Sequence, residues 1–166
     1  MLFKKYPVNA EKILEPCVGD GNIAYEVQGF LPDSKITAID IVDRGYPGTI
    51  VADFLEWETD EKYDLIITNP PFSHAEEFIY KGMPLLEPHG QMMMFLKIQF
   101  LESTRRRMLF EQYPPKYVYV FSKRMGTWRN GEELDPITGR RRPTTICHAW
   151  FIWEQGFIGE PIIRWI

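Results

Sequence analysis

Short apolar runs recur along the chain between longer stretches of mixed polarity, and this alternation predicts strands separated by helices and turns. Apolar runs that end at glycine, proline or an acid are typical of strands buried in a parallel sheet. Such runs occupy residues 12–18, 35–41, 49–54, 63–68, 91–98, 117–121 and 146–153. Apolar positions at helical spacing predict helices over residues 23–28, 75–83 and 102–113.

Strands that alternate with helices favour an α/β fold built on a mainly parallel, doubly wound sheet. Residues 42–48 are too few and too rich in Gly and Pro for a usual crossover helix, so one helix is expected to be missing or reduced to a turn. With 166 residues, the chain fits one domain spanning positions 1–166. Ligands of such folds bind at the carboxyl ends of the strands.

Polar groups stand at this edge after each of the first three predicted strands. The first strand runs into Glu15-Pro16-Cys17-Val18-Gly19-Asp20-Gly21, the second closes on Asp40 and the third on Asp53. Glycines at a helix start let the backbone approach a ligand closely, although a Gly-x-Gly alone is equally consistent with a plain tight turn. Carboxylates here can accept hydrogen bonds from an ammonium, a ribose diol and an exocyclic amine. Turn roles stay open for Asp20 and Asp53.

The fourth predicted strand leads into Asn69-Pro70-Pro71-Phe72. Two consecutive prolines remove two backbone donors and fix two φ angles, so the chain leaves the sheet in one stiff, extended shape. That shape holds the Asn69 carboxamide and the Phe72 ring at the mouth of the sheet. An amide beside an exposed aromatic face is suited to holding a planar ring that bears an amine. The alternative is a strand end with an Asx turn and one core phenylalanine.

Composition restricts the location and the kind of site. No apolar run approaches the roughly 20 residues that span a bilayer, and the N-terminal residues lack the apolar core of a secretory signal. The pattern therefore predicts a soluble cytoplasmic protein with no membrane partner. Cys17 and Cys147 lie far apart in the sequence, which predicts reduced thiols and neither a zinc site nor a disulfide.

The net charge of −4 conceals an uneven distribution. Residues 1–96 carry 7 Lys/Arg against 16 Asp/Glu, a net charge of −9, whereas residues 97–142 carry 11 against 5, a net charge of +6. The long segment 122–144 combines cations with single aromatic rings, which favours contact with nucleic acid over a merely solvated loop. Its candidate substrate-binding residues are Lys123, Arg124, Trp128 and Arg129.

The order of these motifs resembles the class I S-adenosylmethionine-dependent methyltransferases. Within them it is most similar to the amino-methyltransferases with an (Asn/Asp/Ser)-Pro-Pro-(Tyr/Phe/Trp) signature, in particular the small phage-type DNA adenine-N6 methyltransferases. The resemblance implies a seven-stranded Rossmann-like sheet with an antiparallel last strand and S-adenosylmethionine as cofactor. It implies cofactor-binding roles for Glu15, Pro16, Cys17, Gly19, Gly21, Asp40, Ile41, Asp53, Phe54 and Asn69.

Within that set, the resemblance places Glu15 near the methionine ammonium, Asp40 at the ribose hydroxyls and Asp53 at the adenine amine, with Phe54 against the adenine ring. It implies a catalytic role for Asn69, Pro70, Pro71 and Phe72. The Asn69 oxygen and the Pro70 carbonyl would accept both hydrogens of the acceptor amine, and Phe72 would stack on a base flipped out of the duplex.

The implied activity is methyl transfer to adenine N6, with DNA favoured over RNA as the partner. The same signature also serves RNA adenine-N6 and guanine-N2 methyltransferases and enzymes that methylate a glutamine side chain. A cofactor-binding partner subunit or a prophage remnant is the non-enzymatic alternative. Only about a dozen residues precede the first strand and no separate recognition domain is expected, which leaves target recognition to the basic segment, a partner protein or a second subunit of a homodimer.

Overall fold

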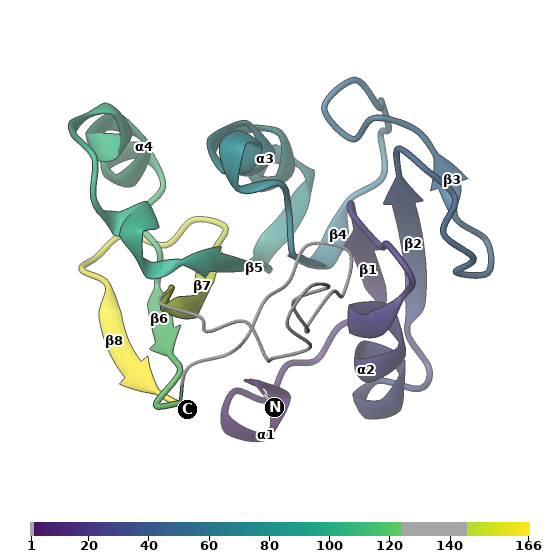
Figure 1. The fold of residues 1–166 in the computed structure, drawn as a ribbon, viewed down its shortest axis with the longest axis horizontal. Helices are drawn as coiled ribbons and strands as arrows, with labels where there is room; N and C mark the ends of the chain where they lie inside the picture. The colour runs from purple at the N-terminus through teal and green to yellow at the C-terminus, as the bar shows by residue number, and fades with distance from the viewer. Residues whose placement is uncertain (1, 124–145) are drawn as a thin grey trace, which may run out of the picture.

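The computed structural model describes residues 2–123 and 146–166 as a three-layer α/β structure, with helices on both faces of one sheet (Figure 1). In the described part, the eight strands have the order β3-β2-β1-β4-β5-β7-β6-β8. Their bounds are β1 Lys12–Glu15, β2 Lys35–Asp40, β3 Ile50–Val51, β4 Tyr63–Thr68, β5 Leu86–Lys97, β6 Tyr117–Val120, β7 His148–Glu154 and β8 Ile162–Trp165. The α-helices are α1 Leu2–Lys5, α2 Asn22–Phe30, α3 Ala75–Gly82 and α4 Arg107–Gln112.

The expected mainly parallel sheet is confirmed, but the count of seven strands is wrong. β7 runs antiparallel to both β5 and β6, as predicted for the strand at residues 146–153. The eighth strand, β8, pairs parallel with β6 and lies beyond the last strand that the sequence predicts. The predicted third strand, residues 49–54, is reduced to Ile50–Val51 at the edge of the sheet.

The helices cover opposite faces of the sheet, with α1 and α2 on one and α3 and α4 on the other (Figure 1). Successive strand residues point to opposite faces, so Met92 and Met94 enter the core cluster that also contains Phe78 and Ile79 of α3. Met93 enters the cluster that contains Phe3 of α1. Because both faces of the central strands are buried, their sequences read as continuous apolar runs.

No α-helix lies between β2 and β3, as the short segment 42–48 predicts. The predicted helix over 102–113 is shorter, with a 3-10 turn at Thr104–Arg106 followed by α4. None of the helices within the described ranges is long and apolar enough to cross a membrane.

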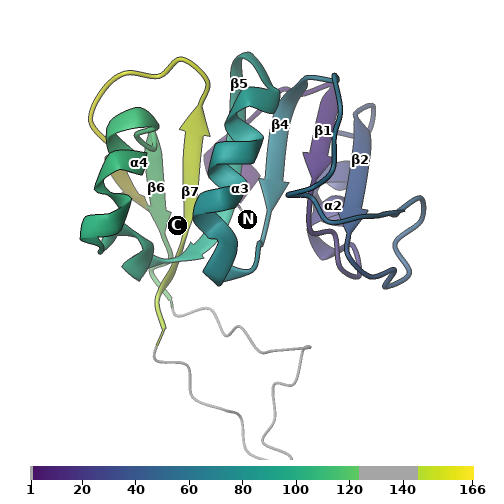
Figure 2. The same cartoon turned by 90° about the horizontal axis from the view of Figure 1, so that it is seen from above.

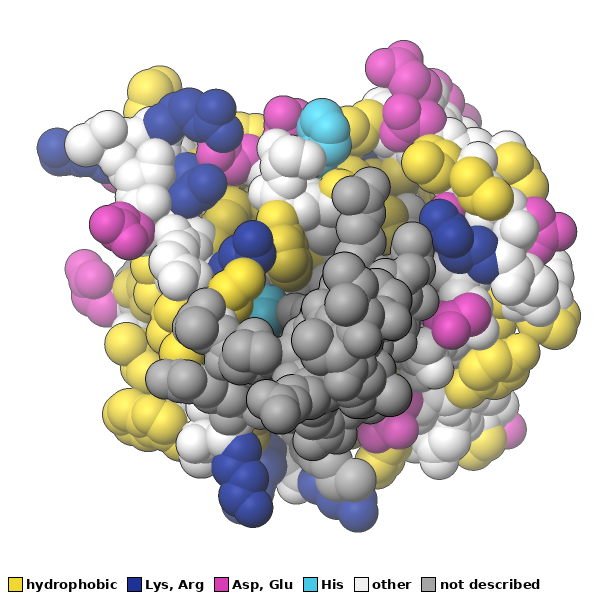
Figure 3. All heavy atoms as spheres, viewed as in Figure 1, with side chains coloured by type: hydrophobic (Ala, Val, Ile, Leu, Met, Phe, Trp, Pro, Cys, Tyr) yellow, Lys and Arg dark blue, Asp and Glu magenta, His cyan; other side chains and the backbone are white. Residues whose placement is uncertain are grey.

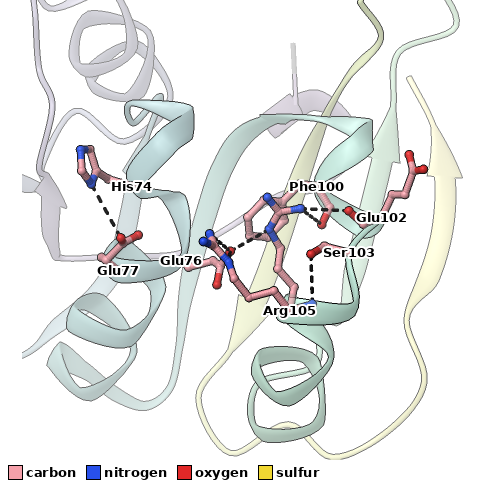
Figure 4. Close-up of polar contacts among 8 residues, drawn as sticks. His74, Glu76, Glu77, Phe100, Glu102, Ser103 and Arg105 are labelled. Carbon is pink, nitrogen blue, oxygen red and sulfur yellow. Dashed lines mark hydrogen bonds and ion pairs between the residues drawn. The ribbon is translucent and has the colours of Figure 1, made fainter.

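Two of the three consecutive arginines hold the connection between β5 and α4 against α3. Arg105 and Arg106 both donate to the Glu76 carboxylate, at 2.7 and 3.0 Å (Figure 4). Arg106 also lies over the Phe100 ring, 4.5 Å from its centroid. The third arginine, Arg107, pairs with a glutamate one turn further along α4 at 2.8 Å. This basic run therefore serves first to tie elements of the fold together.

The parallel strands β1, β2 and β4 end at one edge of the sheet, while β7 runs the other way (Figure 2). We call this edge the carboxyl edge. Figures 1 and 3 look onto it. All the acids and glycines singled out by the sequence lie at or directly after strand ends on this side.

Candidate functional site at the carboxyl edge

Glu15, the last residue of β1, is a carboxylic acid in the interior of the site. Its side chain is only 1% exposed and accepts a hydrogen bond from the Ala24 backbone N–H at the start of α2. Its second oxygen, Oε2, has no hydrogen-bond partner among residues 2–123 and 146–166. Burial, with smaller contributions from the nearby Asp20 and Asp40, raises the pKa of Glu15 to about 9. Glu15 is therefore protonated at neutral pH unless a cation joins it.

Asp40, at the end of β2, holds the glycine loop in place. Its Oδ2 accepts the Gly19 backbone N–H at 2.8 Å and its Oδ1 accepts the Val42 N–H at 3.1 Å. Gly19 and Gly21 have φ values of 57° and 87°, in the left-handed region that favours glycine. Each Asp40 oxygen keeps a second lone pair, so the carboxylate can still accept hydrogen bonds from a ligand.

A side chain that the sequence did not single out closes over Gly21. Tyr46, from the β2–β3 connection, contacts this glycine so closely that a Cβ there would collide with the ring. The Tyr46 ring lies edge-on to Tyr25 of α2, with centroids 5.2 Å apart. Burial and the neighbouring Glu15 raise the pKa of Tyr46. No motif marks this tyrosine; only its place in a Gly- and Pro-rich loop directly after Asp40 could have pointed to it.

Of the three residues expected around an adenine ring, two are exposed and one is buried. Asp53 is exposed, and its Oδ1 accepts the Leu55 backbone N–H at 2.9 Å, which makes it an Asx turn. Ile41 is 66% exposed beside Asp40. Phe54, which was expected against the adenine ring, is 1% exposed and packs in the core against Phe78 with centroids 5.0 Å apart.

Pro16 is buried and Cys17 is half-buried behind the glycine loop. Burial, with a smaller contribution from Asp40, raises the pKa of the Cys17 thiol to about 12. The thiol is therefore protonated and unreactive at neutral pH. Both cysteines are free, as the sequence predicts.

The Asn69–Phe72 segment leaves the end of β4 as the prolines require. Asn69 is exposed, Pro70 is buried and Pro71 is extended, with φ −56° and ψ 121°. Phe72 then starts a 3-10 turn, Phe72–His74, which leads into α3. The Phe72 ring is half-buried at the margin of the core: Lys97 Nζ lies 4.8 Å from its centroid and the His148 ring 5.9 Å.

Neighbouring side chains fix the surroundings of Phe72. Lys97 ends β5 and His148 begins β7, and the two residues are directly opposite each other in the antiparallel pair. The His148 ring stacks on Phe95 with centroids 5.0 Å apart and planes 12° apart. On the carboxyl edge, hydrophobic side chains, a Lys or Arg and a histidine lie side by side near the middle of the view (Figure 3). The sequence places His148 in a strand but does not bring it to Phe72.

His74, two residues beyond Phe72, is a surface residue. Its imidazole makes no capping hydrogen bond to α3, and its Nδ1 lies 3.7 Å from a Glu77 oxygen (Figure 4). Lys123 is exposed just beyond β6. The other candidate substrate-binding residues, Arg124, Trp128 and Arg129, lie outside the described residues.

The order of strands places Asn69 between two sets of side chains. β1 lies between β2 and β4, and β4 lies between β1 and β5. Glu15 and Asp40 therefore lie on one side of Asn69, and Phe72 with Lys97 on the other. Two hollows, of about 320 and 510 Å³, contain none of these residues; His89 and Pro88 line both.

No family model matches the sequence. A type II methyltransferase, M.CvrRI, of Paramecium bursaria Chlorella virus XZ-6E is 38% identical over 68 residues, which cover 36% of this chain and 18% of that protein. A ribosomal protein uL3 glutamine methyltransferase of Bradyrhizobium diazoefficiens is 30% identical over 98 residues, which cover 50% of this chain and 29% of that protein. The chain thus matches less than a third of the length of either relative.

Solved structures settle the fold. A Listeria monocytogenes protein assigned to the class I S-adenosylmethionine-dependent methyltransferases superposes with a TM-score of 0.63 and 14% identity, over 99% of this chain and 60% of that one. The N-methyltransferase NodS of Bradyrhizobium japonicum, in complex with S-adenosyl-L-homocysteine, gives a TM-score of 0.60 and 12% identity, over 89% and 79%. The chain has the class I methyltransferase fold. The predicted α/β architecture is therefore confirmed, apart from the number of strands.

Proposed function

We propose that the chain transfers a methyl group from S-adenosylmethionine to an exocyclic amine of a nucleic-acid base, with adenine N6 in DNA as the favoured acceptor. The observation that carries this proposal is the position of Asn69. Its exposed carboxamide stands between the buried Glu15 carboxyl on one side and the accessible Phe72 ring on the other. A cofactor-binding half and an acceptor half thus meet at one amide.

The residues around β1 and β2 fit this cofactor. The orphaned Glu15 oxygen suits a cationic amine, which would supply the partner that the described residues do not. Gly19 leaves open space where a side chain would stand, since a Cβ there would meet nothing within 4 Å. The remaining lone pairs of Asp40 suit ribose hydroxyls, and the exposed Ile41 suits one face of an adenine ring. Bound S-adenosylmethionine supplies an electrophilic methyl group.

On the acceptor side, the chain must make a poor nucleophile react. The lone pair of an aromatic amine is delocalised into the ring, so positive charge grows on the nitrogen as it attacks. The Asn69 oxygen and the Pro70 carbonyl accept the two amine hydrogens and stabilise that charge, and Phe72 holds the base by stacking. No general base is required before the attack, because the proton can leave afterwards.

Asp40→Ala provides a test of the cofactor half. Loss of the carboxylate leaves the Gly19 and Val42 N–H groups without their acceptor, so the free energy of unfolding should fall by about 1–3 kcal/mol. The rise in melting temperature with S-adenosylhomocysteine should disappear as well. Asp43→Ala, which removes an exposed Asx turn in the same loop, should retain that rise. A full ligand-induced rise in Asp40→Ala would place the ribose contacts elsewhere.

A specific observation favours a second candidate, a glutamine side-chain amide. The similarity to the uL3 glutamine methyltransferase covers half of the chain, and a primary amide is also a planar nitrogen acceptor. RNA adenine-N6 and guanine-N2 amines, and a non-catalytic cofactor-binding subunit, are further alternatives. The type II methyltransferase similarity and the basic charge of residues 97–142 support the nucleic-acid reading.

One assay separates these acceptors. Tritiated S-adenosylmethionine is offered with duplex DNA, with structured RNA and with a protein extract, and the label on each is counted. The proposal expects label on DNA. Label on RNA alone would move the acceptor to RNA, and label on protein alone would favour the glutamine reading. Cofactor binding without transfer to any of the three would overturn the enzyme assignment.

A further inference from the structure

Lys97 occupies a position at the acceptor half of the site that no sequence motif assigns. It ends β5 after five buried residues, 92–96. In the β4–β5 register Thr68 pairs with Met94, so Lys97 lies three residues beyond the last paired residues, at the end of the sheet where the Asn69–Phe72 segment leaves β4. Its half-buried ammonium lies 4.8 Å from the Phe72 ring centroid. A cation thus lies beside the ring on which the acceptor base is expected to stack.

No carboxylate balances this charge within the described ranges. Neither a hydrogen bond nor an ion pair joins Lys97 to an acid among residues 2–123 and 146–166. By contrast, two other lysines of the sheet and its helices, Lys81 and Lys116, have glutamate partners at 2.8 and 2.6 Å. The Phe72 ring offers Lys97 a cation–π contact, which is weaker than a charge-assisted hydrogen bond.

His148, opposite Lys97, adds no charge of its own. It is 1% exposed and stacked on Phe95, and burial together with Lys97 lowers its pKa. The imidazole is therefore neutral at pH 7 and contributes only packing contacts beside Phe72. Among the described residues that touch the Phe72 ring, Lys97 alone carries a positive charge. The cluster combines one ring available for stacking, Phe72, with a neutral imidazole and one cation.

We propose that Lys97 binds the backbone phosphate adjoining the base that stacks on Phe72. A nucleotide brings a planar ring and an anion at a short, nearly fixed separation, which matches a ring with a cation beside it. Lysine suits a phosphodiester as a flexible point charge. A glutamine side chain on a protein would bring the planar nitrogen without the anion. The inference rests on the proposed function and narrows its acceptor to a polynucleotide.

The salt dependence of binding tests this contact directly. Affinity for a mixed-sequence, adenine-containing single-stranded oligonucleotide is measured over a range of salt, with saturating S-adenosylhomocysteine. Each phosphate contact on a single strand contributes about 0.7 to the slope of log affinity against log salt. Lys97→Gln should therefore lower that slope by about 0.7, and Lys97→Arg should keep it. Lys116→Gln, whose partner is Glu154, is the matched control and should keep the wild-type slope.

An oligonucleotide with an uncharged backbone provides a second arm of this experiment. With methylphosphonate linkages beside the adenines, wild type and Lys97→Gln should bind with the same slope, because the phosphate charge is already gone. Unchanged stabilisation by S-adenosylhomocysteine in Lys97→Gln shows that the variant is folded and binds cofactor.

The outcomes separate this inference from the function on which it rests. If wild type labels nucleic acid but Lys97→Gln has the wild-type salt slope, Lys97 only supports the Phe72 ring and the phosphate contact is wrong. If wild type labels protein alone, the nucleic-acid function fails, and the Lys97 contact fails with it.

Discussion

Replacing Asn69 by alanine is expected to lower the rate of methyl transfer by about 10²–10³-fold and to weaken S-adenosylhomocysteine binding much less. The amide oxygen accepts a hydrogen from the acceptor amine as positive charge grows on the nitrogen, and the loss of one well-placed stabilising group of this kind costs about that factor. The side chain is exposed at the end of β4, so its truncation leaves no cavity in the core. Counting of transferred tritium under single-turnover conditions measures the loss.

Two further variants sharpen the Asn69 test. Asn69→Asp keeps an acceptor oxygen in place and should retain more activity than Asn69→Ala. Asn9→Ala removes an exposed asparagine that lines the 320 Å³ hollow, away from the site residues, and should transfer at the wild-type rate. Equal loss in Asn69→Ala and Asn69→Asp would argue for a role of the amide N–H₂ instead. Undiminished transfer by Asn69→Ala would remove this residue from the reaction.

Each group proposed for the cofactor half is local to a strand end, so a sequence pattern can predict its place in the fold. An apolar run fixes the strand, and the residue at which the run stops must lie at the edge. Glu15 and Asp40 end β1 and β2 in the structure, whereas the predicted runs 12–18 and 35–41 continue three residues and one residue further. Their environment could not be predicted: the burial that raises the Glu15 pKa to about 9 depends on the packing of α2 and of the β2–β3 loop.

Phe54 shows where the local pattern fails. The apolar run 49–54 predicts a strand with its last ring at the edge. The strand instead ends at Val51, and the chain turns at Asp53, whose backbone carbonyl accepts the N–H of Trp57 at 2.8 Å. That turn directs the Phe54 ring into the core beneath α3. Apolar periodicity alone does not separate a strand from a turn that buries one ring.

The acceptor half depends on contacts between residues far apart in the sequence. Lys97 and His148 are opposite each other in the antiparallel β5–β7 pair. Both contact Phe72, which follows β4 in the sequence. A register of this kind leaves no motif in the sequence. The lysine at position 97, near the end of the predicted run 91–98, is the single local sign, and it also fits an ordinary strand end.

Glu15→Gln is expected to make the ligand-free protein more stable at pH 7, by about 1–3 kcal/mol, while it weakens S-adenosylhomocysteine binding at least tenfold. The folded-state pKa of Glu15 is raised to about 9, against roughly 4.3 in an unfolded chain. Between these values the unfolded chain releases a proton that the folded chain keeps, so stability falls as pH rises from about 4.3 to about 9. Glutamine does not ionise, so the variant escapes this loss.

Thermal denaturation at pH 5, 7 and 9, with and without S-adenosylhomocysteine, measures both effects. The gain in melting temperature from Glu15→Gln should be small at pH 5 and grow towards pH 9, at about 2–4 °C for each kcal/mol. The ligand-induced rise should shrink at every pH, because the amide cannot neutralise an ammonium. Glu11→Gln, at an exposed position just before β1, should change neither quantity. A Glu15→Gln protein less stable than wild type at pH 9 would mean that the Glu15 carboxylate is ionised and paired in the folded chain, and the ammonium contact would then lose its physical basis.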